Sequence, residues 1–328
     1  MTRGFQLNKE AEQRHNPMKM NCPPRRLIIG AVVALRLLVR SSPAQNLFVA
    51  DGGNGTINEI IPSGTVSTYA NGFAQPVGLA FDSAGDMFVA DYGGGSPGSG
   101  SITKFTPGGG RGNFVSGLSQ PESLAFNSAG DLFEADSESS DINEFTPSGT
   151  KTTFAVGVPD EVGLAFNSAG DLFVSSSIGT IYEFTPFGHQ STFATGLTTP
   201  LEMAFNAAGD LFVADAAPGT NGFITEITPG GTKSIFAAGM NYPEGLAFNS
   251  AGNLFVGTEG GLIYEFTPGG VQSTFASGLS NLDQMAFQGI ALPVPEPSPL
   301  ALLAVGTAAI LVRRNRKTIG TGTLQIGR

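Results

Sequence analysis

The sequence predicts an all-β protein, a six-bladed β-propeller of four-stranded antiparallel blades, and three observations lead to this prediction. A Leu-Ala-Phe motif or a close variant recurs six times, at intervals of about 40 residues. Glycine supplies 46 of 328 residues and phenylalanine 25, a composition typical of short strands joined by tight turns. The repeating region also starts and stops partway through a unit, which favours closure into a ring.

Each repeat is expected to hold four short strands. The Leu-Ala-Phe motif marks the first, and a turn such as 127–131 leads into an apolar second strand such as 132–135. The third strand ends in Thr-Pro, where pairing stops because proline has no N–H donor. The fourth resembles 192–194, and four strands in about 40 residues match the size of one blade. The first-strand motifs occupy 79–81, 124–126, 164–166, 203–205, 246–248 and 285–287.

The phase of the repeat predicts how the ring closes. The region 45–290 opens with a strand of the second type at 46–51 and ends with one of the first type at 285–287. The first blade is therefore expected to take its innermost strand from the C-terminal end, which leaves no free edge where the ring meets. An open solenoid is the structural alternative.

The charge of the repeating region excludes some partners. Residues 45–292 hold only Lys104, Arg111, Lys151 and Lys233 against 24 Asp or Glu, a net charge of −20. Such a body repels phosphate backbones, so no nucleic-acid binding is expected, whereas cations, sugars and basic partners fit. The only cysteine is Cys22, so the propeller has no thiol or disulfide chemistry.

The N-terminal leader, 1–44, contains features of a secretory signal. Arg25 and Arg26 precede an apolar run at 27–39, and small residues follow at 42–44. A basic region, an apolar region and a small-residue cleavage site in this order predict export. A short amphipathic or disordered leader is the alternative.

The C-terminal segment, 291–317, combines three parts in order. Pro295, Glu296 and Pro297 form a Pro-Glu-Pro motif, an apolar run at 300–312 predicts a short membrane helix, and a basic cluster is expected to stay cytoplasmic. The cluster consists of Arg313, Arg314, Arg316 and Lys317, and a polar tail, 318–328, follows.

This C-terminal segment resembles the PEP-CTERM sorting signal. The resemblance implies recognition by an exosortase-type membrane protease in a Gram-negative bacterium. It also implies processing near the motif, and release to the surface or the extracellular matrix after transient anchoring in the membrane. An ordinary membrane tail anchor is the alternative.

The repeat resembles NHL-type propellers and the related gluconolactonase and senescence-marker propellers. The resemblance is carried by 76–82 together with 85–91, a pair of segments repeated across 46–290. This superfamily holds enzymes, scaffolds and binding modules, so the likeness implies the fold and leaves the function open.

One position in each blade is expected near the mouth of the central channel, between the approach to the first strand and its Leu-Ala-Phe motif. Three blades have carboxylates there, and carboxylates that converge on an axis suit Ca²⁺ or another divalent cation. The gluconolactonase resemblance implies metal ligands at matching positions, which makes Glu122, Glu244 and Asp283 the candidates; Glu161 and Glu202 lie in the same approach. The six positions are Val77, Glu122, Val162, Leu201, Glu244 and Asp283.

Other recurring polar residues favour structural roles. The Asp that ends the second strands, as in Asp91 and Asp215, is expected to accept backbone N–H bonds in the turn that follows, and the Glu of the third strands, as in Glu183, to face solvent. His189 lies in a predicted turn, so no Ser-His-Asp set can be assembled and no catalytic residue is assigned.

Two functions follow from these patterns. The first is an exported binding or structural module at the cell surface, with an exopolysaccharide or protein ligand. The second is a divalent-metal-dependent lactone or ester hydrolase of the gluconolactonase type, in which the three carboxylates hold an ion that polarises a carbonyl. The near-identical blades favour the first function over an enzyme.

Overall fold

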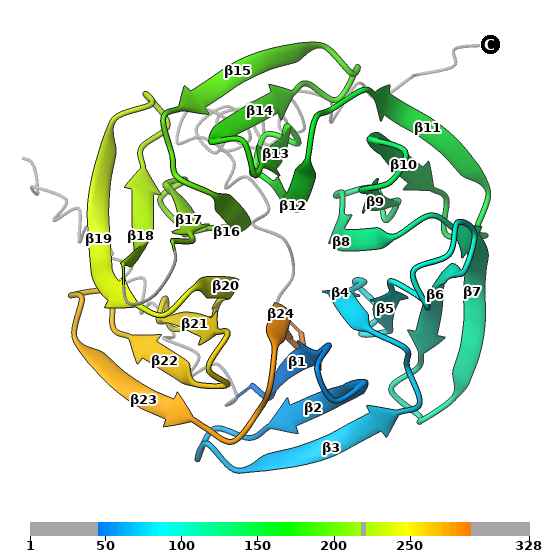
Figure 1. Ribbon diagram of the computed structural model, residues 1–328, viewed down its shortest axis with the longest axis horizontal. Coiled ribbons are helices and arrows are strands. Elements are labelled where there is room, and N and C mark those ends of the chain that lie inside the picture. Colours follow the sequence, from blue (N-terminus) through cyan, green and yellow to red (C-terminus); the bar gives the residue numbers. More distant parts are fainter. Residues whose placement is uncertain (1–44, 218–220, 290–328) are drawn as a thin grey trace, which may run out of the picture. The chain divides into compact units, whose positions relative to one another are not determined.

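Residues 45–217 and 221–289 form a ring of six four-stranded antiparallel blades in a computed structural model of the chain (Figure 1). This confirms the predicted six-bladed propeller. The leader 1–44 and the C-terminal segment 290–328, with the predicted membrane helix at 300–312, lie outside the residues that the structure describes. Within the described ranges, no helix has the length and apolar character needed to cross a bilayer.

Every blade has the same order from the channel outwards. Blade 1 is β24-β1-β2-β3, and blades 2 to 6 follow the chain from β4 to β23. The innermost strands are β4 (Pro76–Phe81), β8 (Pro121–Phe126), β12 (Glu161–Phe166), β16 (Pro200–Phe205), β20 (Pro243–Phe248) and β24 (Leu282–Phe287). The second strands are β1 (Leu47–Asp51), β5 (Met87–Asp91), β9 (Leu132–Asp136), β13 (Leu172–Ser176), β17 (Leu211–Asp215) and β21 (Leu254–Thr258). The third strands are β2 (Thr56–Ile60), β6 (Gly100–Phe105), β10 (Asp141–Phe145), β14 (Thr180–Phe184), β18 (Gly222–Ile227) and β22 (Ile263–Phe266). The outer strands are β3 (Val66–Asn71), β7 (Arg111–Leu118), β11 (Lys151–Val156), β15 (Gln190–Thr195), β19 (Lys233–Met240) and β23 (Gln272–Ala276).

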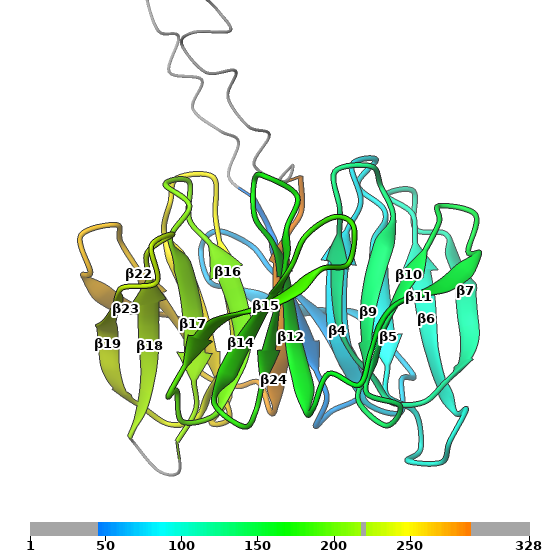
Figure 2. The same cartoon turned by 90° about the horizontal axis from the view of Figure 1, so that it is seen from above.

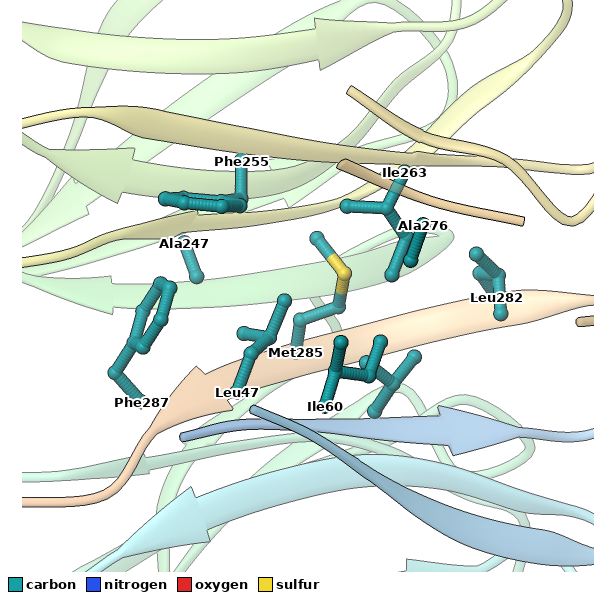
Figure 3. Close-up of a cluster of buried hydrophobic side chains, with 10 residues drawn as sticks. Leu47, Ile60, Ala247, Phe255, Ile263, Ala276, Leu282, Met285 and Phe287 are labelled. Carbon is teal, nitrogen blue, oxygen red and sulfur yellow. The ribbon is translucent and has the colours of Figure 1, made fainter. Parts of the chain in front are cut away.

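The ring closes as the phase of the repeat predicts, because β24 pairs with β1 and completes blade 1. Leu47 lies opposite Phe287 in this pairing, and the N–H of Gln288 donates to the carbonyl oxygen of Asn46 at 3.2 Å. Figure 3 shows the apolar cluster at the closure, where Met285 of β24 lies among side chains of blades 1 and 6. The two ends of the propeller are therefore held by both a backbone ladder and buried apolar contacts.

Phenylalanine ladders join neighbouring blades. Phe88 of β5 makes an edge-to-face contact with Phe114 of its own blade, with ring centroids 5.0 Å apart, and with Phe126 of the next blade at 5.1 Å. Such aromatic pairs add about 0.5–1.5 kcal/mol each beyond their burial. The same contacts recur around the ring, which accounts for many of the 25 phenylalanines.

The Asp that ends a second strand accepts hydrogen bonds from the connection that leads into the innermost strand of the same blade. The Oδ1 atom of Asp215 accepts hydrogen bonds from the N–H groups of Thr198 and Thr199, at 2.7 and 2.9 Å. Asp91 accepts from Ala74 and Gln75 in the same way. These residues accept backbone N–H bonds as expected, but chiefly from the preceding connection rather than from the turn that follows. They therefore fix where each innermost strand begins.

The two ends of the channel differ in what they carry. At one end lie the turns between first and second strands, together with both ends of the described propeller at Gln45 and Gly289. At the other end, the innermost strands begin and the second strands connect to the third strands (Figure 2). We call this second end the mouth.

Candidate functional site: the channel mouth

Five of the six innermost strands bring a carboxyl group to the mouth within their first three residues. Only β4, which begins Pro-Val-Gly, brings none. We call four of these groups the mouth carboxyls: Glu122 of β8, Glu161 of β12, Glu244 of β20 and Asp283 of β24. The fifth, Glu202 of β16, belongs to a hydrogen-bonded group that crosses the channel.

This group, the axial plug, consists of Ser123, Glu202 and Gln284, and it spans the channel below the mouth. The Oε1 atom of Gln284 accepts from the N–H of Leu79 at 2.7 Å and from the N–H of Leu124 at 3.1 Å. Its Nε2 atom donates to Leu124 O at 3.0 Å, Ser123 Oγ at 3.3 Å and Glu202 Oε2 at 3.4 Å. One side chain of blade 1 therefore contacts blades 2, 3 and 5 across the axis.

An alternation at the third residue of the innermost strands makes room for the plug. Blades 1, 3 and 5 have polar side chains there, and blades 2, 4 and 6 have Gly78, Gly163 and Gly245. A Cβ atom on Gly78 would lie 2.8 Å from the carbonyl oxygen of Glu122, closer than real Cβ contacts come. Glycine in every second blade thus lets three polar side chains meet on the axis without a steric clash.

The carboxyl of Glu202 sits in this plug with only 8% of the residue exposed. Burial raises its pKa to about 8, although hydrogen bonds from Ser123, the Met203 backbone and Gln284 act in the opposite direction. At neutral pH the acid is therefore mostly protonated, which suits a buried group whose partners are neutral.

Asp283 and Glu244, on adjacent blades, hold unpartnered oxygen atoms. Asp283 Oδ2 and Glu244 Oε2 are buried and make no hydrogen bond. Burial, together with the negative charges of Glu244, Glu122 and Glu202, raises the pKa of Asp283 to about 8. Burial, with the charge of Glu259, raises the pKa of Glu244 to about 7. Both groups lack the cation or donor that would stabilise their charged forms.

Glu161 and Glu122 extend the cluster towards blades 3 and 4. Glu161 is only 1% exposed, and neither of its carboxylate oxygens has a hydrogen-bond partner. Burial raises its pKa to about 8, and the charges of Glu122 and Asp136 add to the effect. Burial also raises the pKa of Glu122 to about 7, opposed by a hydrogen bond with Ser137.

Lysine and arginine side chains of the described ranges bind elsewhere. Lys104 pairs with Asp86 at 2.6 Å, Arg111 donates to the carbonyl of Asn71, and Lys233 donates to the carbonyl of Thr195. Lys151 begins the outer strand β11. No ion pair within 45–217 and 221–289 involves a mouth carboxyl, so ionisation there leaves negative charge uncompensated by the described part of the protein.

The predicted metal ligands occupy equivalent places in the fold. Glu122, Glu244 and Asp283 are each the second residue of an innermost strand, and the charges of the other two raise the pKa of Asp283. However, no three Asp, Glu, His or Cys side chains in the described residues lie close enough to hold one metal ion. The donor set in this conformation does not fit a metal, and a metal at these residues stays a prediction.

Sequence reasoning did not assign roles to the axial plug or to Glu161. The signal that would find the plug is the alternation of glycine with a polar residue at one position of successive repeats. His189 is exposed in the turn between β14 and β15, as its predicted turn position implies.

Comparisons with known proteins support the sorting signal and the fold. The family model of the PEP-CTERM protein-sorting motif matches residues 293–317. A gluconolactonase from Xanthomonas campestris is 18% identical, with a TM-score of 0.56, over 64% of this chain and 78% of its own. Virginiamycin B lyase from Staphylococcus aureus is 16% identical, with a TM-score of 0.51, over 61% and 69%. A Bacteroides thetaiotaomicron protein of unknown function is 12% identical, with a TM-score of 0.59, over 75% and 71%.

At these identities the solved structures establish likeness of fold alone, and no curated protein matches the sequence. The sorting motif indicates export and cell-surface sorting in Gram-negative bacteria, and it implies processing by an exosortase-type protease. The chain is therefore a six-bladed β-propeller, with structural neighbours of the gluconolactonase and virginiamycin B lyase type, that carries a PEP-CTERM protein-sorting motif.

Proposed function

We propose that this protein is a binding module displayed at the cell surface or in the extracellular matrix, and that its ligand enters the mouth of the channel. The observation that carries the proposal is the set of buried, unpartnered carboxylate oxygens of Glu161, Glu244 and Asp283 at one end of the axis. Buried polar atoms normally have partners, so a ligand that supplies them gains binding energy at this place.

The position of the chain ends is consistent with display. Gln45 and Gly289, the two ends of the described propeller, lie at the end of the channel opposite the mouth. A propeller held through its C-terminal segment at the moment of sorting would present the mouth away from the attachment. The axial plug spans the channel behind this site, so we expect binding and release at the mouth.

Processing at the sorting motif is tested by a triple variant, Pro295→Ala with Glu296→Ala and Pro297→Ala. We expect the protein to remain in the membrane fraction of a Gram-negative host that has an exosortase-type protease, with the released form lost. Immunoblots of membrane and culture-medium fractions check this. A Thr321→Ala/Thr323→Ala variant of the polar tail is the control, and normal release of the triple variant would show that the motif is not used.

Binding at the mouth is tested by calorimetric titration of the purified protein with three probe classes: Ca²⁺ and Mg²⁺, organic amines, and neutral oligosaccharides. We expect one class to bind with a stoichiometry of about one, and binding to fall at least tenfold in a Glu122→Gln/Glu244→Gln/Asp283→Asn variant. Stoichiometric Ca²⁺ binding that is lost in this variant would favour the metal-dependent hydrolase and justify assays with lactones. If no probe bound in a way that depends on these residues, the proposed site would be wrong.

A further inference from the structure

We infer that the ligand of the mouth is an organic cation, an ammonium or guanidinium group on a slender apolar stem. The inference rests on the proposed function, because it names the ligand class for the same site. It is carried by three features of the described residues. The free acceptors lie on separate blades, no described Lys or Arg makes an ion pair with them, and apolar residues occupy the remaining second positions of the innermost strands.

The free acceptors are distributed around the ring rather than gathered at one point. Glu161 belongs to blade 4 and Asp283 to blade 1, on opposite sides of the axis, and Glu244 belongs to blade 6 (Figure 1). A divalent metal ion needs several oxygens within about 2.6 Å of one point. An ammonium group has three N–H donors and a guanidinium group five, which point in different directions. Glu244 and Asp283, on adjacent blades, each offer one free oxygen, which is two acceptors for such donors but fewer than a metal ion needs.

The charge of the ionised mouth carboxyls also favours a cation from outside. Described Lys and Arg side chains make no ion pair with a mouth carboxyl, and the region 45–292 has a net charge of −20. A carboxylate that is buried without a partner is costly, and a hydrogen-bonded cation removes most of that cost. Charge-assisted N–H···O bonds are about twice as strong as neutral ones, so a ligand with this chemistry gains more than a neutral sugar.

Apolar side chains line the remaining second positions of the innermost strands. Val77, Val162 and Leu201 stand on β4, β12 and β16, where the other three blades have carboxyls. Methylene stems of basic groups pack against apolar surface while their charged ends reach polar partners. The axial plug limits how far a ligand can enter the channel. The ligand therefore enters from the mouth, and its charged end stops at the mouth carboxyls.

Basic side chains of a protein supply this chemistry at a cell surface. The free amino groups of a polysaccharide supply the ammonium without the stem, because they are attached directly to the sugar ring. The probes that separate these two sources are an acetyl-trilysine amide and a trimer of glucosamine. Each has a neutral partner of the same shape, the Nζ-acetylated peptide and the N-acetylated trimer. Calorimetric titrations of all four probes into the intact protein, at pH 7 and low salt, form the experiment.

We expect the trilysine probe to bind with a stoichiometry of about one, and both its acetylated partner and the glucosamine trimer to bind at least tenfold more weakly. In the Glu244→Gln/Asp283→Asn variant, the affinity for the trilysine probe should fall at least tenfold. The control is Glu183→Gln/Glu226→Gln, which removes two carboxyl groups from third strands near the opposite end of the ring. This control should change the affinity less than twofold, and thermal unfolding shows whether each variant remains folded.

Three outcomes would overturn the inference. Equal binding of acetylated and free probes would remove the need for a cation, and equal losses in the mouth and control variants would show attraction by net charge alone. Tight Ca²⁺ or neutral-sugar binding that needs the mouth carboxyls, without amine binding, would refute the organic cation and keep the proposed binding site. Failure of every probe at the mouth would refute both.

Discussion

Replacement of Gln284 by alanine is expected to lower the free energy of unfolding by about 3–5 kcal/mol. The amide accepts from two backbone N–H groups of blades 2 and 3 and donates to a backbone carbonyl, and the residue is only 8% exposed. Each buried group left without a partner costs about 1–3 kcal/mol, and the cavity adds to the loss. For a domain of this size the midpoint of thermal unfolding should fall by roughly 6–15 °C, which differential scanning calorimetry measures.

Gln190→Ala is the matched control for this prediction. Gln190 is exposed at the start of the outer strand β15, and removal of its amide should change the stability by less than about 0.5 kcal/mol. A Gln284→Glu variant keeps the size of the side chain but replaces its donor with a second acid beside Glu202. It should also destabilise the propeller, increasingly as the pH rises. Wild-type stability in Gln284→Ala would mean that the plug does not bind the blades together.

The repeat made most of the fold predictable, because the same sequence pattern recurs in each blade. Strand order, closure by β24 and the structural role of Asp91 and Asp215 all follow from spacing and phase within the sequence. These features depend on residues that are close in the chain or that hold equivalent places in each unit. Six repetitions average out the local ambiguity that limits the interpretation of a single strand.

The contacts across the channel were not predictable in the same way. Gln284 and Glu202 are 82 residues apart, and their meeting depends on three-dimensional closure of the ring and on glycine in the intervening blades. The second-position carboxylates were found because their repeat position places them at the mouth. Glu161 is the first residue of its strand, where four other blades have proline. A search at the second position of each innermost strand therefore misses it.

A different departure from the repeat lies inside blade 3. The second strands of the other five blades have valine where β9 has Glu134, and the residue opposite it on β10 is Asn143. Asn143 Nδ2 donates to Glu134 Oε2 at 2.8 Å, while Glu134 Oε1 and Asn143 Oδ1 are buried and accept no hydrogen bond. A protonated Glu134 has the hydroxyl that this amide oxygen lacks, so the pair is complete only when the acid is neutral.

Because of this pair, wild-type stability should fall as the pH rises, and Glu134→Gln should remove part of that fall. Burial raises the pKa of Glu134 to about 8 from 4.5; the charges of Asp136 and Asp141 act in the same direction, and Asn143 and Lys151 oppose them. The folded protein then keeps a proton that the unfolded chain releases between these pH values. The stability is fully present below about pH 4.5 and is lost through pH 8, by roughly 5 kcal/mol at about 1.4 kcal/mol per pH unit.

The comparison of Glu134→Gln with wild type isolates this residue from the mouth carboxyls, whose pKa values are also raised. An amide keeps both hydrogen bonds to Asn143 at every pH, so the two proteins should be equally stable near pH 4, and the variant should be the more stable above pH 8. Glu134→Val with Asn143→Thr, which gives blade 3 the Val–Thr pair of blades 2 and 5, should behave like the amide variant. Urea unfolding at pH 4, 6 and 8.5 measures the difference. A difference between variant and wild type that does not change with pH would mean that Glu134 carries its charge in the folded protein, and that the acid and the amide are not paired as neutral groups.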